Sequence, residues 1–333
     1  MPTSRWLRAA AKVSFSIAVF VLVCFRAEAQ APASFPWRIE ILAVHSKTFS
    51  GEEYLRGDAA GKDVSLGGEL RLPFAVLQGK VPAVVLVHGS GGIASNADSW
   101  ARLLNESGIA VFILDSFSGR GIKSTVEDQS QLDSVAMMYD AYRALDVLAS
   151  HPSIRPDRIA VMGFSKGAVA AVFSASDRFV AKYGGANHFA AHVGMYTPCN
   201  TRFDGDTKVS RAPIRLFHGV SDDYVSVAAC RDFVAQLKAA GADVSLTEYP
   251  DTWHAFDVPT YPPLFELKKA QSTRNCQLRE GPGGVILNAA TSAPYSLKSD
   301  PCVAIGAHIG YSPTSAAAAR ESVTAFFKQT LLN

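Results

Sequence analysis

Three short segments, in chain order, constrain the fold of this chain more than any other feature. Residues 163–167 read Gly-Phe-Ser-Lys-Gly and lie between the apolar run 158–162, which has the pattern of a buried strand, and the alanine- and valine-rich run 168–172, which suits a helix. Further along come His-Gly-Val-Ser-Asp at 218–222 and Trp-His-Ala-Phe-Asp at 253–257. A serine at a strand–turn–helix junction, followed by an aspartate and then a histidine, predicts an α/β fold whose reactive residues meet at the carboxyl ends of its strands.

Apolar runs recur along the chain at the spacing of a parallel sheet. Continuous runs predict buried strands, and segments with apolar residues at three- and four-residue steps predict helices between them. This alternation indicates a doubly wound, mostly parallel sheet in a single domain, to which 38–44, 68–72 and the more alternating 243–249 add strands. The expected buried strands are 81–87, 110–114, 158–162, 189–195 and 214–217, and the expected helices are 96–104, 132–149, 166–174, 227–239 and 315–332.

The first 29 residues have the pattern of a secretory signal peptide. Three basic residues precede an uncharged apolar run at 13–25, and the Ala-Glu-Ala at 27–29 offers an Ala-x-Ala cleavage site. We therefore expect a leader at 1–29, a mature domain at 30–333, and an exported protein, periplasmic or secreted. Two alternatives stay open: an uncleaved membrane anchor, for which the apolar run is short, and a lipoprotein signal at Cys24.

The charge balance argues against a nucleic-acid-binding protein. The whole chain has 32 basic and 30 acidic residues, but the leader holds four of the basic and one of the acidic ones, so the mature chain has 28 against 29 and a net charge of −1. No basic stripe remains to meet a phosphate backbone. The expected partner is a small molecule, with no nucleic acid and, after leader cleavage, no membrane. The sequence does not give the oligomeric state.

Four cysteines remain after leader cleavage, and an even number in an exported chain predicts two disulfides. Three pairings are possible, and we expect Cys199–Cys230 and Cys276–Cys302 because each pair is local to one region of the chain. Buried free thiols are the alternative. The chain has no Cys-x-x-Cys and no closely spaced histidine pair, so no metal site is expected.

One segment departs from the alternation of strands and helices. Residues 259–307 are rich in proline, glycine, serine and asparagine, and a structureless loop of that length is unusual inside a compact domain. Cys276 and Cys302 flank most of it, so we predict a disulfide-tied insertion with room for a hairpin. Because it follows His254 closely, the insertion is a candidate rim or lid for the reactive site.

Ser165 is the candidate nucleophile. A serine hydroxyl has too high a pKa to attack alone, so it needs a base within hydrogen-bond reach and an acid that orients the base. His254, just after the last expected strand of the sheet, is the candidate base, and Asp222, which follows another expected strand, is the candidate acid. Asp223 is an open alternative to Asp222, whereas Asp257 is expected to be structural.

Negative charge on a substrate carbonyl oxygen would need hydrogen-bond donors close to the nucleophile. The His-Gly-Ser-Gly-Gly turn at 88–92 follows an expected strand, and we expect the backbone N–H of Ser90, with Gly91 as the alternative, to supply one donor. The second is the backbone N–H of Lys166, at the positive end of the helix that it begins. The turn matches neither the dinucleotide-binding nor the P-loop spacing, so no cofactor is expected.

Four residues are candidates for contact with substrate. Arg120 follows an expected strand at the same edge of the sheet and could hold a substrate carboxylate; the alternative is an ion pair with Asp115 or another carboxylate. Phe164, Tyr196 and Trp253 are expected to line the pocket. Ordinary core packing is the alternative for each of these three.

The motifs also match those of a known family as a set. The matching residues are His-Gly-Ser-Gly-Gly at 88–92, Asp-Ser-Phe at 115–117, Gly-Phe-Ser at 163–165, His218-Gly219 with Asp222, His-Ala-Phe-Asp at 254–257 and Gly-Tyr-Ser-Pro at 310–313. With these residues the chain resembles the dienelactone hydrolase family of α/β-hydrolases, over about residues 65–258 and 308–330. The resemblance implies an eight-stranded α/β-hydrolase sheet, hydrolysis of esters or lactones, and Asp222 in place of Asp223 as the acid.

The chain also departs from the namesake enzymes of that family. They have a cysteine nucleophile where this chain has Ser165, and they lack both the leader and the 259–307 insertion. We therefore predict a serine-nucleophile variant that cleaves carboxylic esters or lactones through an acyl-enzyme intermediate. The alternatives are a serine peptidase of related fold, which would need a propeller or large cap domain that this chain lacks, and a non-catalytic binding protein, against which the complete set of Ser165, Asp222 and His254 argues.

Overall fold

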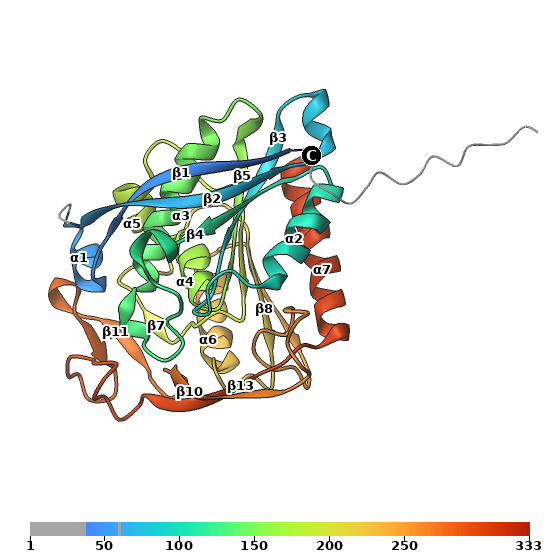
Figure 1. The fold of residues 1–333 in the computed structure, drawn as a ribbon. Helices are drawn as coiled ribbons and strands as arrows, with labels where there is room; N and C mark the ends of the chain where they lie inside the picture. Colours follow the sequence, from blue (N-terminus) through green and yellow to red (C-terminus); the bar gives the residue numbers. More distant parts are fainter. Residues whose placement is uncertain (1–37, 59–60) are drawn as a thin grey trace, which may run out of the picture. The chain divides into compact units, whose positions relative to one another are not determined.

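The computed structural model describes residues 38–58 and 61–333, so the leader expected at 1–29 lies outside the described residues. Within these ranges, no helix combines the length and the hydropathy that crossing a bilayer requires. The labelled elements run from strand β1, which begins at Arg38, to helix α7, which ends at Phe327 (Figure 1).

An eight-stranded sheet forms the centre of the fold, in the order β1-β2-β4-β3-β5-β6-β8-β9. β1 pairs antiparallel with β2, and β2 with β4, whereas the remaining pairs are parallel. The chain leaves β3 toward both edges, which confirms the predicted doubly wound arrangement. The strands are β1 (Arg38–Thr48), β2 (Lys62–Leu72), β3 (Val81–Val87), β4 (Ala110–Asp115), β5 (Ile154–Phe164), β6 (His192–Met195), β8 (Ile214–Gly219) and β9 (Val244–Tyr249).

Helices cover both faces of this sheet, and each face has its own buried core. They are α1 (Gly51–Arg56), α2 (Ser95–Glu106), α3 (Ser134–Ala149), α4 (Lys166–Phe173), α5 (Asp177–Phe179), α6 (Val227–Ala239) and α7 (Pro313–Phe327). On one face Val85 and Val87 of β3 belong to a core with α3, α4 and α6; on the other, Val84 and Leu86 belong to a core with α2 and α7. Because side chains alternate between the faces of a strand, one continuous apolar run builds both cores.

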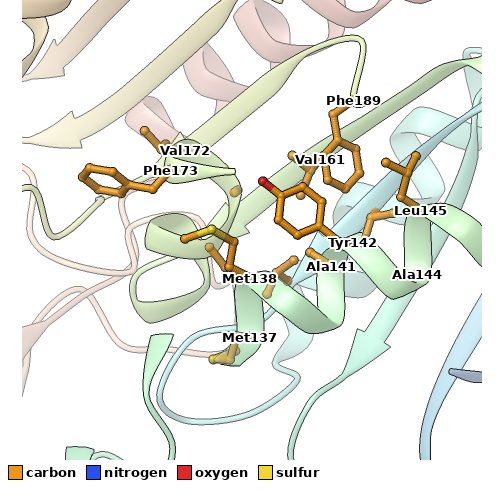
Figure 2. Packing of buried hydrophobic residues seen from close by; sticks show 14 of the residues in the cluster. Met137, Met138, Ala141, Tyr142, Ala144, Leu145, Val161, Val172, Phe173 and Phe189 are labelled. Atoms are coloured by element: carbon orange, nitrogen blue, oxygen red, sulfur yellow. The ribbon is translucent and has the colours of Figure 1, made fainter. Parts of the chain in front are cut away.

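The core beside α3 packs against α4, the helix that follows the candidate nucleophile (Figure 2). Tyr142 of α3 is fully buried, donates its hydroxyl proton to the backbone oxygen of Ser174 at 2.9 Å, and stacks on Phe189 with 6.2 Å between ring centroids. Phe173, the last residue of α4, stacks on Phe233 of α6 at 4.9 Å. These contacts fix α4, and with it the turn at its N-terminus.

Several element ends differ from those expected from the sequence. β5 extends on both sides of the expected 158–162, whereas β6 covers only the second half of the expected 189–195. The reason is that an apolar run reports burial and not hydrogen bonding: Phe189 and Ala191 are buried, but they precede β6. The final helix ends at Phe327, with a π turn beyond it.

The 259–307 insertion is ordered and contributes strands to two small sheets. β10 (Phe265–Ser272) pairs antiparallel with β13 (Ala304–Ile309). β11 (Leu278–Glu280) lies between β12 (Ile286–Asn288) and β7 (Thr201–Arg202). The antiparallel β11–β12 pair is a hairpin, for which the sequence of the insertion left room. Both sheets are separate from the central one.

A bidentate ion pair fixes the insertion to the main domain. Arg178 of α5 donates to both carboxylate oxygens of Glu280 in β11, at 2.6 and 2.7 Å, and the Glu280 side chain is only 3% exposed. The same guanidinium donates to the backbone oxygen of Leu55 in α1 at 2.7 Å. One side chain therefore joins α1, α5 and β11.

Both expected cysteine pairs are within bonding distance. The sulfur–sulfur distance is 1.99 Å for Cys199–Cys230, which joins the segment after β6 to α6, and 2.01 Å for Cys276–Cys302, which closes the insertion on itself. All four cysteines therefore pair locally, as their positions in the chain predicted.

Replacing both Cys276 and Cys302 with serine is expected to lower the free energy of unfolding by about 3 kcal/mol, because the bond restricts an unfolded loop with a sequence separation of 26 residues. Denaturant unfolding of the variant and the wild type measures the difference, with an unchanged m-value as the check on two-state behaviour. The matched control replaces Cys199 and Cys230, whose separation is 31 residues, and should lose at least as much. Equal stability of the first variant and the wild type would contradict the prediction.

Candidate active site

Ser165 lies at the turn between β5 and α4. Its backbone has φ +51° and ψ −117°, a conformation that residues with a side chain rarely adopt. Two glycines make room for this turn: a Cβ on Gly163 would lie 2.0 Å from the backbone oxygen of Gly167, and a Cβ on Gly167 would lie 2.2 Å from that of Val87. The turn therefore holds the serine side chain at the carboxyl end of β5.

A chain of two hydrogen bonds links the three candidate residues. Nε2 of His254 lies 3.0 Å from Oγ of Ser165, and Nδ1 lies 2.7 Å from Oδ2 of Asp222. In the tautomer with its proton on Nδ1, the imidazole donates to the carboxylate and accepts from the serine hydroxyl. The loops after β8 and β9 bring Asp222 and His254 to the turn after β5, because the carboxyl ends of parallel strands share one edge of the sheet.

Asp222 is held in its ionised form. Its Oδ1 accepts hydrogen bonds from the backbone N–H groups of Tyr224 and Val225 at 2.9 and 2.8 Å, and Nε2 of His218 lies 3.3 Å from Oδ2. Burial alone would raise the pKa of Asp222, but His254 and His218 outweigh burial and hold the pKa well below its usual value. Sequence reasoning gave His218 no role, although it lies in the same five-residue segment as the aspartate.

The neighbouring Asp223 has a different partner. Its Oδ1 accepts a hydrogen bond from the backbone N–H of His308 at 2.8 Å, and its Oδ2 lies 2.8 Å from Nδ1 of the same residue. This contact ties the loop after β8 to β13. The sequence motifs left both aspartates open as the acid of the site. The structure joins Asp222, and not Asp223, to His254.

His88 anchors the glycine-rich turn beside Ser165. A Cβ on Gly89 would lie 3.3 Å from Cβ of Ser165, so the two turns are in close contact. Nδ1 of His88 lies 2.9 Å from the backbone oxygen of Gly89, and Nε2 accepts from the backbone N–H of Ser116 at 3.2 Å. Burial lowers the pKa of His88, which favours the neutral ring that these two bonds require. This anchoring was not expected from the sequence.

The turns at 88–92 and 163–167 both have backbone N–H groups near Ser165. Within residues 38–58 and 61–333, the N–H groups of Ser90 and Lys166 have no acceptor, and the same holds for Gly91, the alternative donor. The Ser90 hydroxyl is engaged separately, because it donates to Oε1 of Gln129 at 3.0 Å.

The side chain of Lys166 has a structural role. Its Nζ donates to the backbone oxygens of Gln129 (2.9 Å) and Leu132, and so joins the segment before α3 to the start of α4. Burial lowers the pKa of Lys166 to about 8, against the opposing effects of Asp133 and Asp128. The charge of Lys166 is thus paired within the protein, and a role toward substrate stays a prediction for its backbone N–H.

Two cavities meet at Ser165. The first has a volume of about 90 Å³ and the second about 200 Å³, and Ser90, Ser165 and Tyr224 line both. His254 lines only the first cavity, whereas Lys166 lines only the second. In the described part of the chain, no group of three histidine, cysteine, aspartate or glutamate residues is placed to hold a metal ion.

A model of the dienelactone hydrolase family matches residues 69–331. The chain belongs to that family. Membership makes it a carboxylic ester hydrolase. The resemblance to this family that the sequence motifs indicated is confirmed over most of the chain. Ser165 at the candidate nucleophile position and the ordered insertion at 259–307 are features of this family member.

One curated protein and two solved structures are also similar to this chain. The curated protein named "Probable 2-oxo-3-(5-oxofuran-2-ylidene)propanoate lactonase", from Bradyrhizobium sp., is 26% identical over 216 residues, which cover 58% of this chain and 82% of the relative. Among solved structures, a dienelactone hydrolase-like promiscuous phosphotriesterase from metagenomic libraries is 17% identical with a TM-score of 0.52, covering 87% of this chain and 98% of that one. The structure named m3DLH is 20% identical with a TM-score of 0.56, covering 88% and 99%. The two structures share the fold.

Two of the expected pocket residues of this dienelactone hydrolase family member do line a cavity. Phe164 and Tyr196 both line the first one, and the Tyr196 ring centroid lies 4.6 Å from that of His254. Tyr196 is held in place by Asp257, whose Oδ1 accepts its hydroxyl proton at 2.8 Å and whose Oδ2 accepts from Nε1 of Trp100 at 2.7 Å. Asp257 is thus structural, as expected.

Of the two roles left open for Arg120, the structure shows an ion pair with another carboxylate and no place in either cavity for a substrate contact. Its guanidinium donates to both carboxylate oxygens of Asp140, at 2.8 and 2.9 Å, and the two side chains are 4% and 0% exposed. The Arg120 guanidinium also donates hydrogen bonds to Oγ1 of Thr48 and to the backbone oxygens of Lys47 and Ser116. Arg120 lines neither cavity, so it fixes the loop after β4 against β1 and α3 through a buried ion pair.

Replacing Arg120 with alanine is expected to lower the free energy of unfolding by about 3–5 kcal/mol, because it leaves the Asp140 carboxylate buried without its cation. Denaturant unfolding measures the loss. The matched control, Arg120→Met with Asp140→Leu, removes both charges and should recover most of the stability. An Arg120→Ala variant of unchanged stability with a KM raised more than tenfold for carboxylate-bearing esters would restore the substrate role.

Trp253 is a second correction, since it lines neither cavity. Its ring lies 5.3 Å from that of His308, next to the Asp223 contact. Adjacent residues of an irregular turn point in different directions, so the neighbour of a reactive histidine need not face the substrate. Trp253 packs the β13 side of the loop while His254 faces Ser165.

Proposed function

We propose that this protein is a serine hydrolase that cleaves carboxylic esters or lactones through a Ser165–His254–Asp222 triad and an acyl-enzyme intermediate. The observation that carries the proposal is the pair of hydrogen bonds at 3.0 and 2.7 Å through His254, at a strained serine turn within the family match. The lactonase named among the relatives supports including lactones in the substrate class.

Each residue has one role in the proposed reaction. Ser165 Oγ attacks the acyl carbon while His254 Nε2 takes its proton, and the buried Asp222 carboxylate stabilises the imidazolium that results. Hydrogen bonds from the backbone N–H groups of Ser90 and Lys166 stabilise the negative charge on the carbonyl oxygen, and the positive end of the α4 dipole adds to this effect. His254 then gives the proton to the leaving oxygen, and water cleaves the acyl-enzyme by the same steps.

Two assays on the mature protein test this proposal. A fluorophosphonate probe should label Ser165 and leave the Ser165→Ala variant unlabelled, whereas no labelling would favour a binding protein on this fold. A panel of p-nitrophenyl esters, run beside p-nitroanilide peptides, should show turnover of the esters only. Faster turnover of the anilides would make the protein a serine peptidase.

We also propose that the protein is exported, periplasmic or secreted, after removal of residues 1–29. The support is the leader pattern of the sequence together with two cysteine pairs at bonding distance, since disulfides persist in oxidising compartments. N-terminal sequencing of protein recovered from the periplasm or medium should begin at Gln30. Full-length protein retained in the cytoplasm would contradict export.

A further inference from the structure

Ser165 lies where two cavities of unequal size meet, and the residues that line them differ in chemistry. Building on the proposed function, we propose that the larger cavity binds the acyl group of the substrate and the smaller one the alcohol. The preferred substrate is then an ester that joins a neutral, ring-sized acyl group to a short alkyl alcohol.

The position of His254 sets the direction of the substrate. In the proposed reaction the leaving oxygen receives its proton from Nε2 of His254, so this oxygen must lie within hydrogen-bond reach of that atom. His254 lines the smaller cavity and not the larger one. The alkoxy group therefore points into the smaller cavity, and the acyl substituent, on the other side of the reacting carbon, points into the larger one.

The cavity volumes separate the two groups by size. An apolar cavity of about 150 Å³ in another protein is large enough to bind benzene. The larger cavity here, at about 200 Å³, exceeds that volume, whereas the smaller one, at about 90 Å³, does not. A six-membered ring therefore fits the proposed acyl site, and a methyl or ethyl group fits the proposed alcohol site.

The walls of the larger cavity favour an uncharged acyl group. Some of its polar side chains are already paired: Gln271 accepts from the backbone N–H of Gln129 and donates to the backbone oxygen of Leu297, and Ser272 donates to that of Tyr224. Among the described residues the Tyr295 hydroxyl has no partner and can hydrogen-bond an uncharged group, while the Asp133 carboxylate disfavours an anionic one. Its one lysine, Lys166, donates to two backbone oxygens. The remaining walls include the apolar side chains Leu55, Val169, Phe203, Leu278, Ile286 and Leu297.

The insertion supplies a fixed wall of this proposed acyl site. Leu278, Ile286, Tyr295 and Leu297 all come from the 259–307 segment. The Cys276–Cys302 bond and the buried ion pair of Glu280 hold that segment in place. A fixed wall limits the size of the acyl group, so substrate selection is expected to depend on side chains of the insertion.

Two isomeric esters test the orientation without any mutation. Methyl phenylacetate and benzyl acetate have the same atoms and both release an unactivated alkyl alcohol, but the ring is on the acyl side of the first and the alcohol side of the second. The wild type should show a kcat/KM at least tenfold higher for methyl phenylacetate. A preference for benzyl acetate, or turnover of methyl acetate with neither isomer accepted, would overturn the proposal.

A matched pair of variants locates each group. Leu297 and Leu267 are partly buried leucines of the insertion that line the larger and the smaller cavity, respectively. Leu297→Trp should lower kcat/KM for methyl phenylacetate about tenfold and leave benzyl acetate within twofold, while Leu267→Trp should do the reverse. Ile286→Phe is the second variant for the larger cavity if Leu297→Trp does not fold. The opposite pattern would overturn the assignment.

Methyl acetate separates this inference from the proposed function. Both cavities accept its small groups, so the wild type should hydrolyse it in a Ser165-dependent manner. If the wild type turns over no ester in a Ser165-dependent manner, the proposed function fails. If methyl acetate is hydrolysed through Ser165 but the isomer ranking is reversed, only the assignment of the two cavities fails.

Discussion

Replacing Ser165 with alanine is expected to lower kcat for ester hydrolysis by about 10⁴- to 10⁶-fold. The variant loses the attacking oxygen, and the hydrogen bond of 3.0 Å to Nε2 of His254, but little packing. Steady-state rates on p-nitrophenyl acetate, with active-site titration of the wild type, measure the effect. Circular dichroism and the thermal midpoint should match the wild type, because the loss of one oxygen atom does not change the turn.

The control for this variant is Ser90→Ala. It removes the hydroxyl that donates to Gln129 but keeps the backbone N–H that is the proposed donor to substrate, so we expect less than a tenfold loss of rate. Retention of more than a tenth of wild-type activity by Ser165→Ala would reject Ser165 as the nucleophile. A large loss in Ser90→Ala would assign its hydroxyl a role that the backbone was expected to fill.

Asp222→Asn is expected to lower kcat by about 10⁴-fold, whereas Asp223→Asn should stay within a few-fold of the wild type. An amide at position 222 can donate to Nδ1 of His254, which would put the imidazole proton on Nε2, facing Ser165 instead of accepting from it. Asp223 contacts His308 at a partly exposed pair and does not contact the imidazole of His254.

The pair of asparagine variants is its own control, since the two substitutions are identical and one residue apart. Thermal unfolding of both variants checks that the activity difference is not a difference in folded fraction. The reverse ranking, with Asp223→Asn inactive and Asp222→Asn mild, would move the acid by one residue and contradict the hydrogen bonds described here.

Much of the fold could be predicted because each step used a local pattern. The continuous apolar run at 81–87 became β3, whose two faces fill two cores, and the Gly-x-Ser-x-Gly at 163–167 became the turn after β5. The order of serine, aspartate and histidine then placed Ser165, Asp222 and His254 together, because parallel strands bring their carboxyl ends to one edge.

The predictions that failed concern side-chain direction. Arg120 follows β4 at the same edge of the sheet as Ser165, but its guanidinium pairs with Asp140. That aspartate lies within α3 and not on a neighbouring strand. Trp253 is adjacent to His254 and faces the other way. Neither outcome has a signature in the neighbouring residues, since it depends on a partner from another element.

The sequence by itself determined the class of fold and the serine and histidine of the proposed triad, and it favoured the local pairing of the cysteines, because these follow from periodicity, strand order and spacing along one chain. Only the tertiary structure decided between Asp222 and Asp223, gave His88 and His218 their roles, and placed Ser165 between two cavities. The physical reason is that hydrogen bonds and cavities are made by atoms from distant segments, and a difference of one residue or one rotamer exchanges their partners.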